Sequence, residues 1–191
     1  METILCICMG VGMAAACGFR VFAPLLVLSI ASGAGHVTLA PAFSWIGTTP
    51  ALVVFSVATV LEIGAYYIPW LDNFLDSIAT PAAVVAGTIV TASMLTNVSP
   101  LMQWSLAVIA GGGVAGVVQG ATVLTRTVST AASAGLANPV VATAELGLAG
   151  VFSFLSLTWP VVAVVLVLGL LIFMVIKIRR RFFVGRGKAI C

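Results

Sequence analysis

Four charged residues stand inside long apolar segments of this sequence, where a charge is expensive. Arg20 and Arg126 each follow a run of small residues, and Glu62 and Glu145 each precede a glycine by two positions. A charge in the interior of a membrane costs roughly 3 kcal/mol on insertion scales and is normally paired or faces water. Each glutamate could neutralise an arginine or carry a proton. The pattern therefore predicts a polar path lined by Arg20, Glu62, Arg126 and Glu145.

Arg20 is the strongest single candidate for a functional residue. Pro24 follows it by one helical turn, has no backbone N–H, and so leaves the carbonyl of Arg20 without its helical partner. A helix break is therefore predicted beside the charge, and broken helices with a nearby charge recur at transporter substrate sites. The alternative is an ion pair between Arg20 and Glu62 that only holds helices together. Arg126 stands near the end of its predicted span, where its long side chain can reach the membrane surface.

A second candidate site lies in the stretch PWLDNFLD at residues 69–76. On a helix, Asp72 and Asp76 are four residues apart and share a face, with Asn73 beside them. These three residues are a candidate cation or gating site, or a partner for Arg126; the alternative is an amphipathic segment at the membrane surface. No third carboxylate adjoins them, and the four cysteines and the single histidine show no metal-ligand spacing, so no metal and no cofactor are expected.

The composition predicts a membrane protein. Hydrophobic residues make up 62% of the chain and charged residues only 7%, against roughly a quarter in soluble domains. The net charge of +3 comes from a basic tail that begins at Lys177, and no basic face with interleaved aromatic residues exists. The expected partners are the lipid bilayer and a small solute, an ion or a lipid headgroup, with no nucleic acid.

The hydropathy pattern predicts an all-α polytopic protein with about six transmembrane helices. A helix needs about 20 apolar residues to cross a bilayer. The segments that approach this requirement are residues 4–31, 51–68, 80–96, 101–126, 139–157 and 159–178. The basic tail at 179–191 places the C-terminus in the cytoplasm, and six spans return the N-terminus there too. The loop at 33–50 is then external, and the amphipathic segment at 69–79 is cytoplasmic.

The two halves of the chain carry the same ladder of small residues. Its members recur every fourth position, and each is separated from its counterpart by 102 positions: Gly10, Ala14 and Gly18, then Gly112, Gly116 and Gly120. Gly33 and Gly135 share this separation. Residues 1–97 and 98–178 are therefore predicted to be two three-helix repeats with inverted topology. The ladders predict close packing of the first and fourth spans with each other, or with symmetry mates in a homo-oligomer; chance is the alternative, since small residues are common in membrane helices.

Several local motifs together resemble a known family. They are Gly18-Phe19-Arg20 with Pro24, then Glu62 leading into the 68–76 stretch, then Asn138-Pro139-Val140-Val141 before Glu145. This pattern is similar to the bacterial membrane proteins catalogued as domain of unknown function 4126, and it spans nearly the whole chain. The resemblance implies a location in the bacterial cytoplasmic membrane and supplies no activity. Family members often carry Ala-Asp-Lys where this chain has Ala65-Tyr66-Tyr67, and an acid-Asp pair where it has Glu145-Leu146.

Three functions are compatible with these residues. The leading one is a transporter or channel for a small solute or ion, with the buried arginines and glutamates along its path. A carrier for anionic lipid phosphates is the second, because arginine suits a phosphate headgroup. A non-catalytic scaffold is the third. An enzyme is not expected, since the sequence offers no nucleophile–base set and no phosphate-cradling loop.

Overall fold

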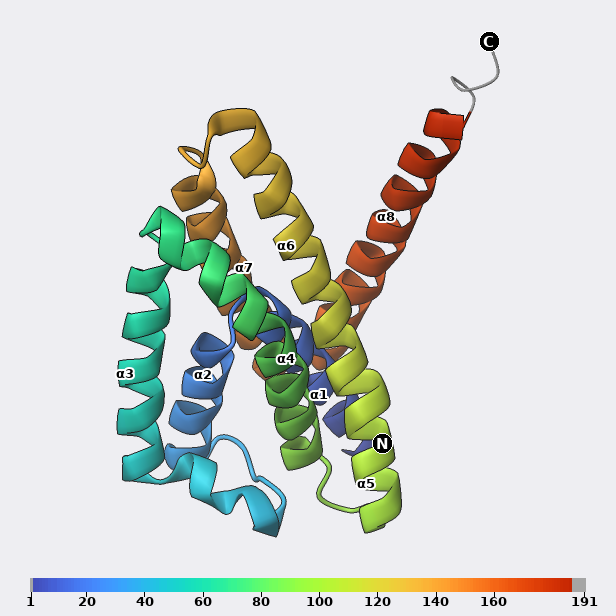
Figure 1. The fold of residues 1–191 in the computed structure, drawn as a ribbon. Helices are drawn as coiled ribbons and strands as arrows, with labels where there is room; N and C mark the ends of the chain where they lie inside the picture. Colours follow the sequence, from blue (N-terminus) through green and yellow to red (C-terminus); the bar gives the residue numbers. More distant parts are fainter. Residues whose placement is uncertain (1, 187–191) are drawn as a thin grey trace.

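The computed structural model describes residues 2–186, except for the side chains of residues 69–74, 76, 175 and 177–186. The described chain is helical throughout and contains no strand (Figure 1). The elements in chain order are α1 (Glu2–Phe19), α2 (Phe22–Gly33), the 3₁₀ helix η1 (Pro41–Gly47), α3 (Thr49–Ala65), α4 (Pro69–Met94), α5 (Pro100–Leu106), the π-helical turn η2 (Ala107–Gly112), α6 (Gly113–Ser133), α7 (Asn138–Thr158) and α8 (Pro160–Arg186).

The apolar helices are those of a multi-pass membrane protein. Four described helical stretches are long and apolar enough to cross a bilayer: α1, the Ser77–Met94 part of α4, the continuous Pro100–Ser133 run, and α7. The pair formed by η1 and α3, bent by 63°, would make a fifth. The all-helical membrane class is therefore confirmed, with four or five candidate crossings among the described residues.

The predicted span at 4–31 is wrong, because the chain forms two helices there. Helix α1 ends at Phe19, the backbone turns at Arg20 and Val21, and α2 begins at Phe22. In Figure 1, α2 runs back downward from the tip of α1. Pro24 lies in the first turn of α2, where its missing N–H costs no helical hydrogen bond. The proline thus favours a new helix start after the turn.

Contacts between loops define two ends of the helix bundle. At the lower end in Figure 1, the amide of Ala40 donates to the carbonyl of Ser93 at 2.8 Å, and residues of the start of α1 share a pocket with 95–98. At the upper end lie the turns at 66–68 and 134–137, and the hydroxyl of Tyr67 lies 2.9 Å from that of Thr143 in α7. Helices α1 and α2 therefore both open toward the lower end, and the α1–α2 hairpin carries its tip inside the bundle.

The α1–α2 hairpin also affects where the two described ends of the chain lie. The N-terminal start of α1 lies toward the lower end, whereas α8 ends at the top right of Figure 1. The sequence predicts both chain ends on one side, because its hydropathy makes residues 4–31 a single crossing. The reversal at Arg20 and Val21 adds a direction change that hydropathy does not reveal.

Two other predicted boundaries also move. Helix α4 runs without interruption from Pro69 through Pro81 to Met94, so the segment predicted at 69–79 is continuous with the following span, of which Ser77–Met94 is a candidate crossing. Inside a membrane protein a proline is tolerated within a helix, since neighbouring groups satisfy the freed backbone. The fourth span, expected at 101–126, continues through η2 to Ser133, two turns beyond Arg126.

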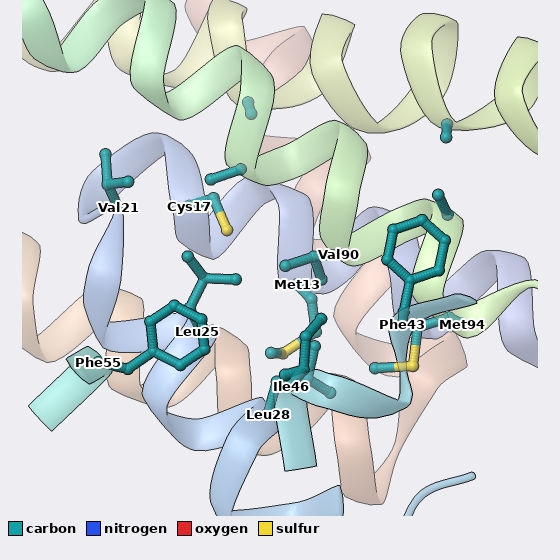
Figure 2. Packing of buried hydrophobic residues seen from close by; sticks show 14 of the residues in the cluster. Met13, Cys17, Val21, Leu25, Leu28, Phe43, Ile46, Phe55, Val90 and Met94 are labelled. Atoms are coloured by element: carbon teal, nitrogen blue, oxygen red, sulfur yellow. The ribbon is translucent and has the colours of Figure 1, made fainter. Parts of the chain in front are cut away.

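Two apolar clusters hold the bundle together. Figure 2 shows the larger one, in which Met13 and Cys17 of α1 lie among side chains of α2, η1, α3 and α4. Leu28 and Ile46 are fully buried there. The smaller cluster joins α1 to α6, α7 and α8, and its Phe19 and Phe152 rings stack with centroids 5.8 Å apart. Helix α1 is thus the shared core of both clusters.

The small-residue ladders allow close packing, but mostly with α4. A Cβ on Gly18 would lie 2.7 Å from the carbonyl oxygen of Ala115, so α1 and α6 do touch at this point. Gly10 instead faces Thr91 of α4, and Gly112 and Gly116 also face α4. Gly120 meets nothing within 4 Å. Helices α1 and α6 therefore pack together with a close approach at Gly18, while Gly10, Gly112 and Gly116 pack against α4.

Candidate functional site

Five buried side chains from distant parts of the chain meet at the tip of the α1–α2 hairpin. The exposed fractions are 2% for Arg20, 8% for Glu62, 3% for Tyr66, 3% for Arg126 and 4% for Glu145. Arg20 comes from the α1–α2 turn, Glu62 from α3, Tyr66 from the residue that ends α3, Arg126 from α6 and Glu145 from α7. The structure thus brings together all four charges that the sequence singled out and adds an aromatic ring. We call these five residues the charge cluster.

Glu62 caps the start of α2. Its Oε1 accepts from the amide of Val21 at 2.8 Å, and its Oε2 accepts from the amide of Phe22 at 3.1 Å. The first amides of a helix lack intrahelical partners and carry partial positive charge, so a carboxylate is favourable there. Both oxygens of Glu62 are engaged in this way. Among the described contacts no ion pair joins it to Arg20, so the pairing considered for these two residues is wrong.

Arg126 and Glu145 form a two-point ion pair. Arg126 Nε donates to Glu145 Oε1 at 3.1 Å, and Arg126 Nη2 donates to Glu145 Oε2. Paired donors of this kind are among the stronger hydrogen bonds in proteins and fix the geometry of both groups. The expectation that Arg126 reaches the membrane surface is wrong, since α6 continues to Ser133 and buries the guanidinium.

Only one guanidinium nitrogen of Arg20 has a hydrogen-bond acceptor among the described atoms. Its Nη2 donates to the carbonyl oxygen of Ala142 at 2.9 Å and lies 3.8 Å from Glu145 Oε2. Its Nε and Nη1 are buried and have no hydrogen-bond partner among the described atoms. A guanidinium offers five N–H donors, so most of the donor capacity of Arg20 is unused.

The ring of Tyr66 contacts both arginines. The guanidinium carbon of Arg20 is 3.8 Å from the ring centroid, and that of Arg126 is 3.9 Å from it. A cation over an aromatic face is attracted by the ring, most strongly where water is excluded. Sequence reasoning missed this residue. The available signal was its position, one turn after Glu62 and at the place where the resembling proteins often carry aspartate.

The remaining predicted residues lie outside the cluster or outside the described side chains. Pro24 is in the first turn of α2, close to the two amides that Glu62 binds. The side chains of Asp72, Asn73 and Asp76 lie outside the described residues, although their backbone belongs to α4. Within the described part of the chain, no three His, Cys, Asp or Glu residues are grouped so that they could hold a metal ion.

Comparison with known proteins identifies the family of the chain. No curated protein and no solved structure matches it significantly. The family described as "Domain of unknown function (DUF4126)" matches residues 7–180. This range includes the whole charge cluster and every element from most of α1 into α8. The chain therefore belongs to the DUF4126 family.

Proposed function

We propose that this protein is an integral membrane transporter or channel for a small solute or ion. Its path would pass the charge cluster at the tip of the re-entrant hairpin, with Arg20, Glu62, Arg126 and Glu145 along it. The observation that carries the proposal is the convergence of these four charges and Tyr66 within the bundle. Intramembrane charges that gather inside a bundle usually serve solutes, ions or protons.

The break between α1 and α2 supports the same proposal. Discontinuous helices expose backbone groups inside the membrane, and transporters use such ends to bind polar substrates. Here the two amides of Val21 and Phe22 at the break donate to the carboxylate of Glu62, and the preceding residue is the buried Arg20. The described part of the cluster holds two arginines and two glutamates, so its formal charge balances without a ligand. Because its charges balance, the site can remain folded inside the membrane when no ligand is bound.

The function test is a flux measurement in proteoliposomes with a panel of small cations and anions. Flux of at least one species is expected, and Arg20→Ala and Glu62→Gln should each abolish it. Thr143→Val is the matched control, because it removes only exposed hydroxyl contacts, with the hydroxyl of Tyr67 and the carbonyl oxygen of Pro139. Undiminished flux in both cluster variants would refute the proposal, and so would a wild-type protein that moves none of the species.

We propose an orientation in which the basic tail lies in the cytoplasm of a bacterial cell and the start of α1 lies outside. The basic tail supports the first assignment through the positive-inside rule. The re-entrant hairpin supports the second, because α1 begins at the bundle end opposite to the end of α8. The loop at 33–50 would then be external, together with the N-terminus.

Cysteine labelling in intact cells tests this orientation. In a background with the four native cysteines replaced by serine, Thr3→Cys and Ser44→Cys should react with a membrane-impermeant maleimide. Both positions are exposed at the lower end. The native Cys191, restored alone, should react only after the cells are opened. Equal labelling of position 3 and Cys191 would contradict the assignment.

We further infer that the two halves are related as an inverted repeat and that the protein is not an enzyme. The repeat is supported by the ends of α2 and α6, at Gly33 and Ser133, each followed two residues later by a glycine with positive φ. Those glycines are Gly35, with φ 77°, and Gly135, with φ 87°. Their separation along the chain is two positions shorter than the separation of the ladder residues. A non-catalytic role is supported by the engagement of both glutamates as ligands of other protein groups.

A further inference from the structure

We propose that Arg20 binds an oxyanion of the phosphate type at the tip of the α1–α2 hairpin, as the substrate-recognition residue of the path. The inference rests on the proposed function, since it names the class of ligand that the path accepts. The ligand is either a free inorganic anion or the phosphate of a lipid headgroup, because both present the same oxygens to a guanidinium.

The unused donors of Arg20 carry this proposal. Only Nη2 has an acceptor, the carbonyl oxygen of Ala142, while Nε and Nη1 have none among the described atoms. The residue is 2% exposed, so bulk water does not reach these groups. Buried donors in proteins are almost always satisfied, and a charged donor without an acceptor is especially unfavourable. A ligand with several acceptor oxygens satisfies them.

The surroundings favour an anion over a cation. Both oxygens of Glu62 accept from backbone amides, and both oxygens of Glu145 accept from Arg126. Among the described side chains of the cluster, every carboxylate oxygen therefore already accepts a hydrogen bond, and a cation would have to compete with these donors. The groups that remain unsatisfied are positive, and a second guanidinium, that of Arg126, lies 3.9 Å from the ring centroid of Tyr66.

The contacts of Glu62 show that the start of α2 binds a carboxylate. Its carboxylate already occupies the amides at the start of α2, a position that suits any small oxyanion. It therefore acts as an internal competitor, and its negative charge opposes the entry of a second anion beside Arg20. Neutralising Glu62 should strengthen anion binding, whereas altering Arg20 should weaken it. These opposite signs separate a binding site from a purely structural cluster.

The test is equilibrium binding to the full-length protein in detergent micelles, with radiolabelled inorganic phosphate and short-chain phosphatidic acid as probes. Arg20→Lys keeps one positive charge but lacks Nε and Nη1, so it should lose binding by tenfold or more. Glu62→Gln should tighten binding several-fold, and Thr143→Val should leave it unchanged. If Arg20→Lys does not fold, the sign of the Glu62→Gln effect decides. Unaltered binding in the variants that fold would overturn the proposal.

The two probes distinguish the source of the anion. Binding of phosphate, in competition with phosphatidic acid, supports a free inorganic ligand. Binding of phosphatidic acid alone supports a lipid headgroup. No binding of either probe at millimolar concentration overturns the proposal and assigns the donors of Arg20 to water. Binding without flux would retain the anion site and remove transport, whereas cation flux without anion binding would do the reverse.

Discussion

The ion pair between Arg126 and Glu145 should dominate the stability of the charge cluster. Glu145→Gln removes the negative charge that receives two donors of Arg126 and that also lies 3.8 Å from Arg20. Removing one partner of a buried pair typically costs about 3–5 kcal/mol, since the other charge stays buried and uncompensated. Arg126→Met should cost a similar amount, because it strands the carboxylate and also removes one of the two guanidiniums over the Tyr66 ring.

The double variant Arg126→Met, Glu145→Gln decides between pairing and independent roles. If each single change cost about 4 kcal/mol independently, the double variant would lose about 8 kcal/mol. Because the second change removes the stranded charge, we expect a loss of only about 4 kcal/mol, with a coupling energy of similar size. The free energy of unfolding, measured by SDS titration in mixed micelles, gives all four corners of the cycle. Additivity to within about 0.5 kcal/mol would refute the reasoning.

Three further changes test the fold around the cluster. Glu62→Gln should lower the free energy of unfolding by about 1.5–3 kcal/mol, because one charge-assisted acceptor is lost. Hydrogen exchange at the first amides of α2 should accelerate, and unchanged exchange would argue against the cap. Tyr66→Leu should lower the free energy of unfolding by about 2–4 kcal/mol, because two guanidiniums lose the aromatic ring that they contact. Tyr66→Phe keeps the ring and should keep most of the thermal stability in detergent. Equal losses of stability in the two variants would show that the ring faces contribute nothing. Gly18→Ala should lower the free energy of unfolding by about 1–3 kcal/mol, since its Cβ would lie 2.5 Å from the Cβ of Val118. The Cβ of Gly120→Ala meets nothing within 4 Å, so this control should not lower the melting temperature. Similar melting temperatures for the two variants would contradict the packing.

The membrane class and the members of the charge cluster could be predicted from the sequence, because both follow from the cost of charge in an apolar environment. Arg20, Glu62, Arg126 and Glu145 stand out against their apolar neighbours, and pairing is their cheapest solution. Which charge meets which group could not be predicted. Glu62 binds backbone amides 41 and 40 positions away instead of a side chain, and local patterns carry no information on such a contact.

The reversal at the hairpin tip and the role of Tyr66 were beyond the sequence for a related reason. An apolar run that continues from α1 into α2 reads as one span, and the turn exists because an acceptor arrives from α3. A tyrosine at the end of an apolar helix ordinarily indicates the membrane surface. Here Tyr66 is buried because two guanidiniums converge on it from other helices. The glycine ladder likewise shows that two backbones approach closely, but not that α4 is the main partner.

The dependence of the α1–α2 hairpin on later segments constrains how the protein is assembled. Ribosomes deliver this hairpin first, with an arginine and two helix-start amides at its tip. Their acceptors, the carboxylate of Glu62 and the carbonyl of Ala142, are synthesised 41 and 122 positions afterwards. In a nascent chain that ends before α7, the guanidinium of Arg20 therefore does not yet have its native oxygen acceptor. Final seating of the first helices is consequently a late step, completed only when nearly the whole polypeptide has entered the bilayer.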